Sequence, residues 1–184
     1  MQALAPALEI KPDRTYLRAM KTLAEDALSE QDPNSGGWHY QLSHGHCFCT
    51  VKHVGEAGFI GCVRMNGLCK YYQLTGDKRI PNSLKRYIDH LINDTWDERA
   101  SDWRYTSCPA TRVVNQIGVT MRAMVHSARI TGDPEHIRIL NKAWKAKFAR
   151  LKKLASDPDY AGGAGKLYSL SMYGSTEAAS LFNE

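Results

Sequence analysis

The chain has 184 residues, of which 43% are hydrophobic and 23% are charged, as in an ordinary globular domain. A chain of this length can bury a substantial core, so we expect one domain. The net charge is +5, and no apolar run approaches the roughly 20 residues that a membrane-spanning helix needs. The opening residues MQALAPALEIKPD also lack the basic start and apolar core of a secretion signal, so the sequence assigns no compartment and no membrane partner.

The first predicted helix covers residues 14–30, with Asp13 as its N-cap. Its apolar residues recur at three-and-four spacing, which predicts one buried stripe. This stripe comprises Leu17, Met20, Leu23, Ala24, Ala27 and Leu28. Residues 1–12 are interpreted as an N-terminal extension, and residues 13–184 as a helical-hairpin domain.

Two helices are expected next, over residues 56–74 and 80–95. Two more follow over residues 112–130 and 134–155, and the last of these begins with Pro134, where a helix tolerates proline. The helix at 134–155 carries seven basic residues, which we interpret as a solvated outer face rather than a nucleic-acid contact. They are Arg138, Lys142, Lys145, Lys147, Arg150, Lys152 and Lys153. After the glycine-rich stretch DPDYAGGAGK, a weaker segment at 175–182 predicts a sixth helix.

Two stretches of the chain share one pattern: GFIGCVRMNGLCKYYQLTGD ends at Asp77, and NQIGVTMRAMVHSARITGD ends at Asp133. Each is an apolar helix stopped by Thr-Gly-Asp and followed by another helix. Glycine ends helices because it enters the left-handed conformation without a side-chain penalty. The spacing from Asp77 to Asp133 is 56 residues (133 minus 77), which suits a repeating pair of helices. The sequence thus predicts an all-α fold of antiparallel helical hairpins.

Long and short connections alternate along the chain. The long ones cover residues 31–55, 96–111 and 156–175, and the short ones follow Thr75 and Thr131. Antiparallel helices place alternate connections at opposite ends, so all the long loops should lie at one end. Loops gathered on a rigid scaffold are the usual place for binding or catalysis.

The first two long loops are rich in aromatic and polar side chains, and Gly37-Trp38-His39-Tyr40 echoes Asp102-Trp103-Arg104-Tyr105. Aromatic faces stack on the apolar faces of sugar rings, while charged groups bind the hydroxyls. We therefore take four of these residues as candidate saccharide-binding groups: Trp38, Tyr40, Trp103 and Arg104. In the alternative interpretation, Trp38 and Trp103 close the end of the bundle as part of the core.

Two chemistries have candidate residues in the same loops. A glycosidase needs two carboxylates, for which Glu56 and Asp102 are available, although Glu56 also suits the first turn of a helix as a partner of its dipole. A polysaccharide lyase would use histidine and tyrosine as base and acid. For that role the loops supply His44, His46, His53 and Tyr105.

Five cysteines are present: Cys47, Cys49, Cys62, Cys69 and Cys108. Cys62 and Cys69 lie seven residues apart on one apolar helix face, which favours buried reduced thiols. The run from His44 to His53 contains enough sulfur and imidazole donors for zinc or copper, but its spacing fits no standard zinc site. The sequence alone therefore predicts no metal and no cofactor.

Long helices, Thr-Gly-Asp turns in phrases such as KYYQLTGDKR, and aromatic long loops resemble the (α/α) toroids of six-hairpin glycosidase-like proteins and heparinase-type polysaccharide lyases. The resemblance spans residues 14–155 and carries over no catalytic signature. Members of these families close a full ring of hairpins, so it implies that this chain is a partial toroid, belonging to a larger one.

Two hypotheses follow. In the first, the chain is a carbohydrate-processing domain of glycoside hydrolase or polysaccharide lyase type, with an oligosaccharide or polysaccharide held by exposed aromatics at the long-loop end. In the second, it is a noncatalytic helical-repeat module for protein interaction or scaffold support, with those aromatics buried and one apolar flank exposed. Either hypothesis allows a homo-oligomer or neighbouring hairpins of a longer chain. Nucleic acid is not expected as a partner, because no recognition module is present.

Overall fold

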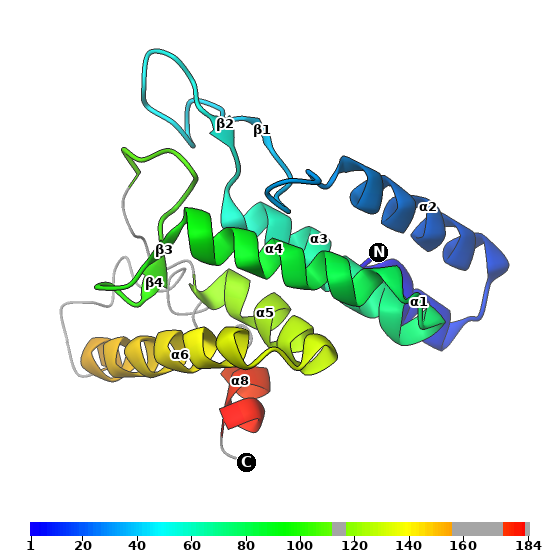
Figure 1. Ribbon diagram of the computed structural model, residues 1–184. Coiled ribbons are helices and arrows are strands. Elements are labelled where there is room, and N and C mark those ends of the chain that lie inside the picture. The colour runs from blue at the N-terminus through cyan, green and yellow to red at the C-terminus, as the bar shows by residue number, and fades with distance from the viewer. Residues whose placement is uncertain (112–116, 156–174, 183–184) are drawn as a thin grey trace.

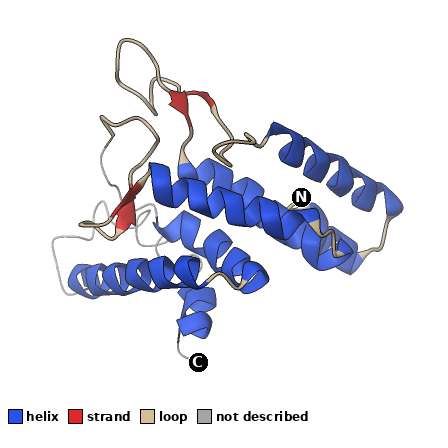
Figure 2. Cartoon of the chain, viewed as in Figure 1, coloured by secondary structure: helices blue, strands red, loops and turns tan. Residues whose placement is uncertain are grey.

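The computed structural model describes residues 1–111, 117–155 and 175–182 (Figure 1). Its helices are α1 (Leu4–Ile10), α2 (Arg14–Glu30), α3 (Gly58–Thr75), α4 (Arg79–Asp94), α5 (Ile117–Thr131), α6 (Pro134–Ala155) and α8 (Ser175–Phe182). Two antiparallel strand pairs join them: β1 (Tyr40–Gln41) with β2 (Val54–Gly55), and β3 (Trp96–Asp97) with β4 (Asp102–Trp103). The predicted all-α class is confirmed, and the strands are confined to the long loops, as Figure 2 shows.

Three helices, α2, α6 and α8, begin and end at the predicted residues. Helix α3 starts two residues later than predicted, because Glu56 lies in the extended segment after β2 and its backbone N–H bonds to Ser107 Oγ at 2.9 Å. The predicted start of the fourth helix, at 112–116, lies outside the described residues. Helix α1 was not predicted, since it is only seven residues long and has no side-chain cap. Its Ala5 is buried and joins the main core.

Both Thr-Gly-Asp turns have the expected geometry. Gly76 and Gly132 have φ values of +67° and +66°, the left-handed conformation that ends a helix. Asp77 Oδ1 accepts a hydrogen bond from Arg79 N at 3.0 Å, and Asp133 Oδ1 accepts one from Glu135 N at 3.0 Å. Each aspartate therefore satisfies a free N–H group at the start of the next helix.

The helices form antiparallel hairpins, α3 with α4 and α5 with α6, and α5 lies between α3, α4, α6 and α8 (Figure 1). The β1–β2 and β3–β4 loops meet at one end, while the Thr-Gly-Asp turns lie at the other (Figures 1 and 2). The prediction that the long loops gather at one end is thus confirmed for these two. The third predicted long loop, at 156–175, lies almost entirely outside the described residues.

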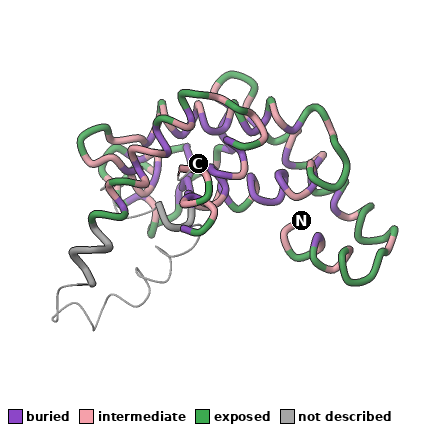
Figure 3. Tube along the Cα trace, turned by 90° about the horizontal axis from the view of Figure 1, so that it is seen from below, coloured by how far each residue is buried: buried purple, intermediate pink, exposed green. Residues whose placement is uncertain are grey.

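Buried residues concentrate where the helices face one another (Figure 3). On α2, Met20, Ala24 and Ala27 are buried as predicted, but Leu17 and Leu23 are 41% and 43% exposed. The apolar stripe of α2 is wider than the surface that α1 and α3 cover. Leu17 and Leu23 therefore form an exposed apolar flank on α2.

Among the basic side chains of α6 that the structure describes, Lys147 differs from the prediction, while those of Arg150, Lys152 and Lys153 lie outside the described part. Lys147 is only 1% exposed and its ammonium lies 5.7 Å from the Trp144 ring, so this lysine does not belong to a solvated face. Burial lowers the pKa of Lys147 to about 8, although the charge of Asp102 opposes the shift.

None of the described helices combines the length and the apolar character that crossing a bilayer requires.

Candidate metal centre

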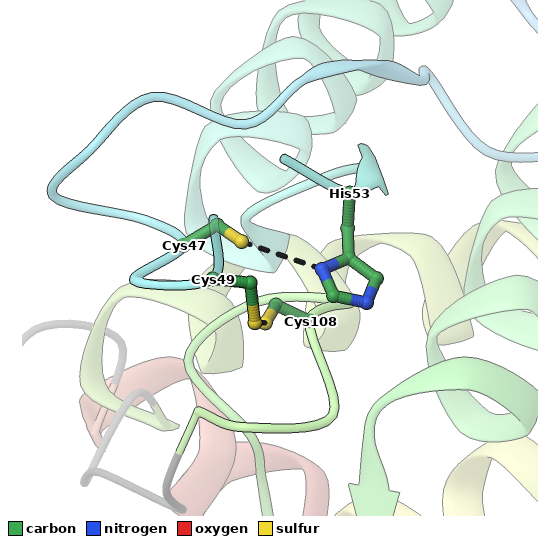
Figure 4. Close-up of side chains that lie close together, drawn as sticks. All are labelled: Cys47, Cys49, His53 and Cys108. Carbon is green, nitrogen blue, oxygen red and sulfur yellow. Dashed lines mark hydrogen bonds between the residues drawn. The ribbon is translucent and has the colours of Figure 1, made fainter. Parts of the chain in front are cut away.

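Four metal-binding side chains converge where the two long loops meet (Figure 4). Cys47, Cys49 and His53 come from the loop between β1 and β2, and Cys108 follows β4. Their ligand atoms all lie within 4.8 Å of one another. Cys47 Sγ is 3.3 Å from His53 Nδ1, and Cys49 Sγ is 3.8 Å from Cys108 Sγ. We call these four residues the Cys3His cluster.

Local hydrogen bonds shape the first loop so that its donors face inward. The β1–β2 ladder continues through a bond from Leu42 N to His53 O at 3.0 Å, which places His53 beside the start of the loop. A turn from Ser43 follows, in which Cys47 N bonds to Ser43 O at 2.9 Å. The ammonium of Lys52 then donates to the carbonyl oxygens of Cys47 and Cys49 at 2.9 and 2.8 Å. Lys52 thereby closes the segment that carries both thiols.

The second loop brings in Cys108 from a distant part of the chain. Thr106 Oγ1 donates to His46 O at 2.9 Å, and it accepts a bond from Cys108 N at 3.2 Å. Cys47, Cys108 and Leu42 are buried together in a small hydrophobic cluster separate from the main helical core. The Cys3His cluster is thus shielded from solvent on the side where the loops touch.

Two of the separations are close to those of a tetrahedral zinc site. Zinc takes Cys and His ligands at about 2.3 and 2.0–2.1 Å, so the corners of such a tetrahedron are about 3.8 Å apart for two sulfurs and about 3.6 Å for sulfur and nitrogen. The measured Cys49–Cys108 and Cys47–His53 distances are 3.8 and 3.3 Å. Three thiols with one imidazole also form a donor set that favours zinc over magnesium or calcium.

The thiols of the Cys3His cluster differ in pKa. Hydrogen bonding by His53, through its backbone and its ring, lowers the pKa of Cys47 to about 6. The hydrogen bond with Cys108, together with burial, raises the pKa of Cys49 to about 11. At neutral pH the thiolate form of Cys47 is therefore favoured even without a metal. Deprotonation of the neighbouring Cys49 is disfavoured, because it would place a second negative charge close to the first.

Glu56 lies at the base of the same loops but is not open to a substrate. It is 1% exposed, its Oε2 accepts a bond from Trp38 N at 3.1 Å, and its Oε1 lies 3.3 Å from His90 Nε2. Ser107 Oγ donates to Asp94 Oδ2 at 2.5 Å and accepts from Glu56 N. This buried network ties both long loops to α4.

A partly exposed aromatic group lies beside the cluster. The rings of Phe59 and Tyr105 stack with centroids 5.8 Å apart, and His46 meets both of them edge-on at 5.9 and 5.5 Å. Tyr40 Oη lies 3.5 Å from His46 Nδ1. Three of the residues singled out in the sequence, Tyr40, His46 and Tyr105, are thus brought together.

The two tryptophans are not exposed platforms. Trp38 is 4% exposed, and its Nε1 donates to Ala27 O at 2.7 Å. Trp103 is 2% exposed and packs on Trp96 with ring centroids 4.7 Å apart, because β3 and β4 pair these two residues. Both rings therefore fill the end of the helical core, as the alternative interpretation expected.

The remaining candidates are separate from one another. Asp102 is fully buried, and its Oδ1 accepts a bond from Trp103 N at 2.8 Å. Arg104 donates to the carbonyl oxygen of Asp94, and His44 is exposed beside Phe48. Asp102 and Glu56 are both buried, so neither presents a carboxylate to a sugar in this structure.

The sequence reasoning missed Cys108, which the structure places beside the three donors of the first long loop as a possible fourth. Cys108 lies 55 residues after His53 (108 minus 53), far beyond the spacing of familiar zinc motifs. The available signal was the alternation of long and short connections, which placed both loops at one end of the fold. His46, adjacent to Cys47, instead turns toward Phe59 and Tyr105.

Cys62 and Cys69 are buried in α3, as predicted. Burial raises the pKa of Cys69 to about 12 and that of Cys62 well above its ordinary value, so both stay protonated thiols.

Comparisons with models of protein families, with curated proteins and with solved structures find no match to this chain.

Proposed function

We propose that this chain is a noncatalytic helical-hairpin module whose two long loops are fastened together by one zinc ion bound at the Cys3His cluster. The observation that carries the proposal is the convergence of Cys47, Cys49, His53 and Cys108, with separations close to a zinc tetrahedron. All four positions are filled by protein ligands. Closed sites of this kind are structural rather than catalytic, because no position remains for water or substrate.

Two further features support a scaffold. The carboxylates of Glu56 and Asp102 and the rings of Trp38 and Trp103 are buried at the loop end, so they stabilise the fold instead of facing a ligand. On the apolar flank of α2, formed by Leu17 and Leu23, Leu23 lines a cavity of about 480 Å³ together with Val63. In this proposal a further hairpin stacks on that flank, as expected if the chain is one arc of a larger toroid.

Metal content and spectroscopy test the zinc site. The purified chain, dialysed against metal-free buffer, should retain about one zinc ion per chain, as measured by inductively coupled plasma mass spectrometry. Replacement of zinc by Co²⁺ should give the intense near-ultraviolet bands of thiolate-to-cobalt charge transfer together with the visible bands of tetrahedral Co²⁺. Cys108→Ala should lose both signals.

Cys62→Ala is the matched control, since it truncates an equally buried cysteine outside the cluster. It should keep the metal and the spectrum. A chain that holds no metal and instead contains a Cys49–Cys108 disulfide would refute the proposal. So would equal metal loss in the two variants.

A second candidate function rests on the partly exposed group of His46, Phe59 and Tyr105. We infer that, if the chain is the carbohydrate-binding domain expected from the resemblance, a saccharide stacks on this group rather than on Trp38 or Trp103. Oligosaccharides of neutral and uronic sugars should then bind saturably by calorimetry. Tyr105→Ala should abolish the heat, while Tyr16→Ala, which removes a partly exposed tyrosine of α2, should not.

A further inference from the structure

Two sulfur atoms of the Cys3His cluster face each other across the two long loops. Cys49 Sγ lies 3.8 Å from Cys108 Sγ, and the two residues are 59 positions apart in the chain. Figure 4 shows these two sulfurs side by side, while Cys47 is directed to His53. The sulfurs of a disulfide lie about 2.05 Å apart, so this pair has to close by less than about 2 Å to form one.

Hydrogen bonds to the backbone keep both cysteines in this arrangement. Lys52 Nζ donates to Cys49 O at 2.8 Å, and Cys108 N donates to Thr106 Oγ1 at 3.2 Å. Thr106 Oγ1 in turn donates to His46 O at 2.9 Å, which joins the second loop to the first. These bonds hold the two sulfurs within reach of each other, although they come from distant parts of the chain.

The three thiols of the cluster differ in their access to solvent. Cys47 and Cys108 are 0% exposed, whereas Cys49 is partly exposed. A cysteine bound to a metal is a thiolate, the form that reacts with oxidants. A dissolved oxidant therefore reaches Cys49 first, while Cys62 and Cys69 are shielded from it by their burial in α3.

We propose that the Cys3His cluster is a peroxide-sensitive switch, in which formation of a disulfide between Cys49 and Cys108 releases the bound zinc ion. The switch rests on the zinc site of the proposed function, since a cluster without metal has no ion to release. In the reduced state, zinc joins the two loops through four ligands. In the oxidised state, one disulfide joins them, and Cys47 and His53 no longer bind a metal.

The oxidation proceeds in two steps. The Cys49 thiolate attacks hydrogen peroxide, so that an S–O bond forms, the O–O bond breaks and hydroxide leaves; the product is a sulfenic acid. The Cys108 thiolate then attacks the Cys49 sulfur, which forms the S–S bond, breaks the S–O bond and expels a second hydroxide. The two cysteines lose two electrons, and the peroxide gains them. Two thiolate ligands are thereby lost, and Zn²⁺ leaves with its oxidation state unchanged.

Zinc release from the full chain tests the switch. The reduced, zinc-loaded protein is treated with hydrogen peroxide in the presence of a colorimetric zinc indicator. About one zinc ion per chain should be released, at least about tenfold faster than in a sample without peroxide, because the metal depends on thiolate ligands. Dithiothreitol and added zinc should then restore the bound metal, since thiol–disulfide exchange reduces the disulfide.

Peptide mapping identifies the cysteines that react. Phe48 lies between Cys47 and Cys49, so cleavage by chymotrypsin after Phe48 places these two cysteines in separate peptides. After alkylation of the remaining thiols, mass spectrometry without reduction should find the Cys49 peptide joined to the Cys108 peptide and Cys47 alkylated. A disulfide that includes Cys47, or zinc release without any disulfide, would overturn the proposal.

Cys62→Ala is again the matched control, because it removes a buried thiol outside the cluster. It should release zinc at the rate of the parent, and protection from peroxide in this variant would overturn the proposed pair. The zinc content before peroxide is added separates the two proposals. A chain without zinc at that point refutes the proposed function and the switch together, whereas a chain that holds zinc and keeps it in peroxide refutes the switch alone.

Discussion

Gly61 shows how closely α3 and α4 approach each other. A Cβ atom at this position would lie 1.8 Å from Tyr87 Oη and 2.3 Å from its Cζ, and Tyr87 is fully buried. The ring has no free space to move into, so only glycine fits.

Gly61→Ala should therefore destabilise the protein by about 1–3 kcal/mol, the usual cost of overpacking a core. Urea unfolding followed by circular dichroism measures this change. Gly45→Ala is the control, because its new methyl would meet no atom within 4 Å, and its free energy of unfolding should stay within about 0.5 kcal/mol of the parent. Equal stability of the two variants would contradict the close contact.

His90 makes stability depend on pH. Burial alone would lower its pKa, but the adjacent carboxylate of Glu56, with the charges of Asp94 and Asp32, outweighs burial and raises it. The folded state thus holds the proton more tightly than the unfolded state. This contribution to stability is complete below the unfolded pKa of about 6.5 and disappears as the pH rises through the folded pKa.

We expect the difference in unfolding free energy between the parent and His90→Gln to decrease as the pH rises above about 6.5. Urea unfolding at a series of pH values measures it, and the exposed His44→Gln serves as control for the substitution itself. A difference that grows with rising pH would mean that His90 is held neutral, contrary to its contacts with Glu56 and Asp94.

At the scale of elements, a buried amide joins the end of α2 to α4. Gln31 is 6% exposed, and its Nε2 donates to Gly36 O at 2.7 Å and to Ser83 O at 3.0 Å. Ser83 Oγ in turn donates to Gln31 Oε1 at 2.7 Å. These bonds fix where α2 ends relative to the neighbouring hairpin.

Gln31→Ala should destabilise the protein by about 1–3 kcal/mol, because it leaves the buried Ser83 hydroxyl and two carbonyls without their partner. Thermal unfolding checks this value. The exposed Gln41→Ala should change the melting temperature little. A small effect of Gln31→Ala would indicate that water replaces the amide.

At the scale of the whole molecule, the helices and the loop end depend on different interactions. The main core joins side chains of all the described helices, whereas Leu42, Cys47 and Cys108 form a separate small cluster at the loop end. Trp38 and Trp103 anchor the bases of both loops in the main core, whereas few apolar contacts hold the small cluster together, so the proposed zinc ion should contribute most of that cluster's stability.

Removal of zinc with a chelator should therefore increase amide hydrogen exchange at residues 40–55 and 104–108 and leave α3, α4 and α5 protected. Hydrogen exchange read by mass spectrometry, with and without chelator, measures both regions. Cys108→Ala should reproduce the chelated pattern without chelator. Loss of protection throughout the helices would mean that the two clusters do not unfold separately.

Local sequence signals determined the helices and the turns of this protein. Apolar periodicity, Asp13 as a cap and the two Thr-Gly-Asp turns act within a few residues, so α2, α6, α8 and the hairpin arrangement follow from them. The helix α1 escaped notice because seven residues without a cap give little signal, and its packing in the core supplies its stability.

Only the tertiary structure decided which loop residues meet. Cys108 joins Cys47, Cys49 and His53 because the β1–β2 and β3–β4 loops emerge at the same end of two stacked hairpins. The burial of Trp38, Glu56 and Lys147 was also decided by the tertiary structure, because it depends on neighbours far away in the chain. The sequence determines the elements through interactions over one or two turns, whereas the candidate metal centre arises from contacts across more than 50 residues, which no local pattern encodes.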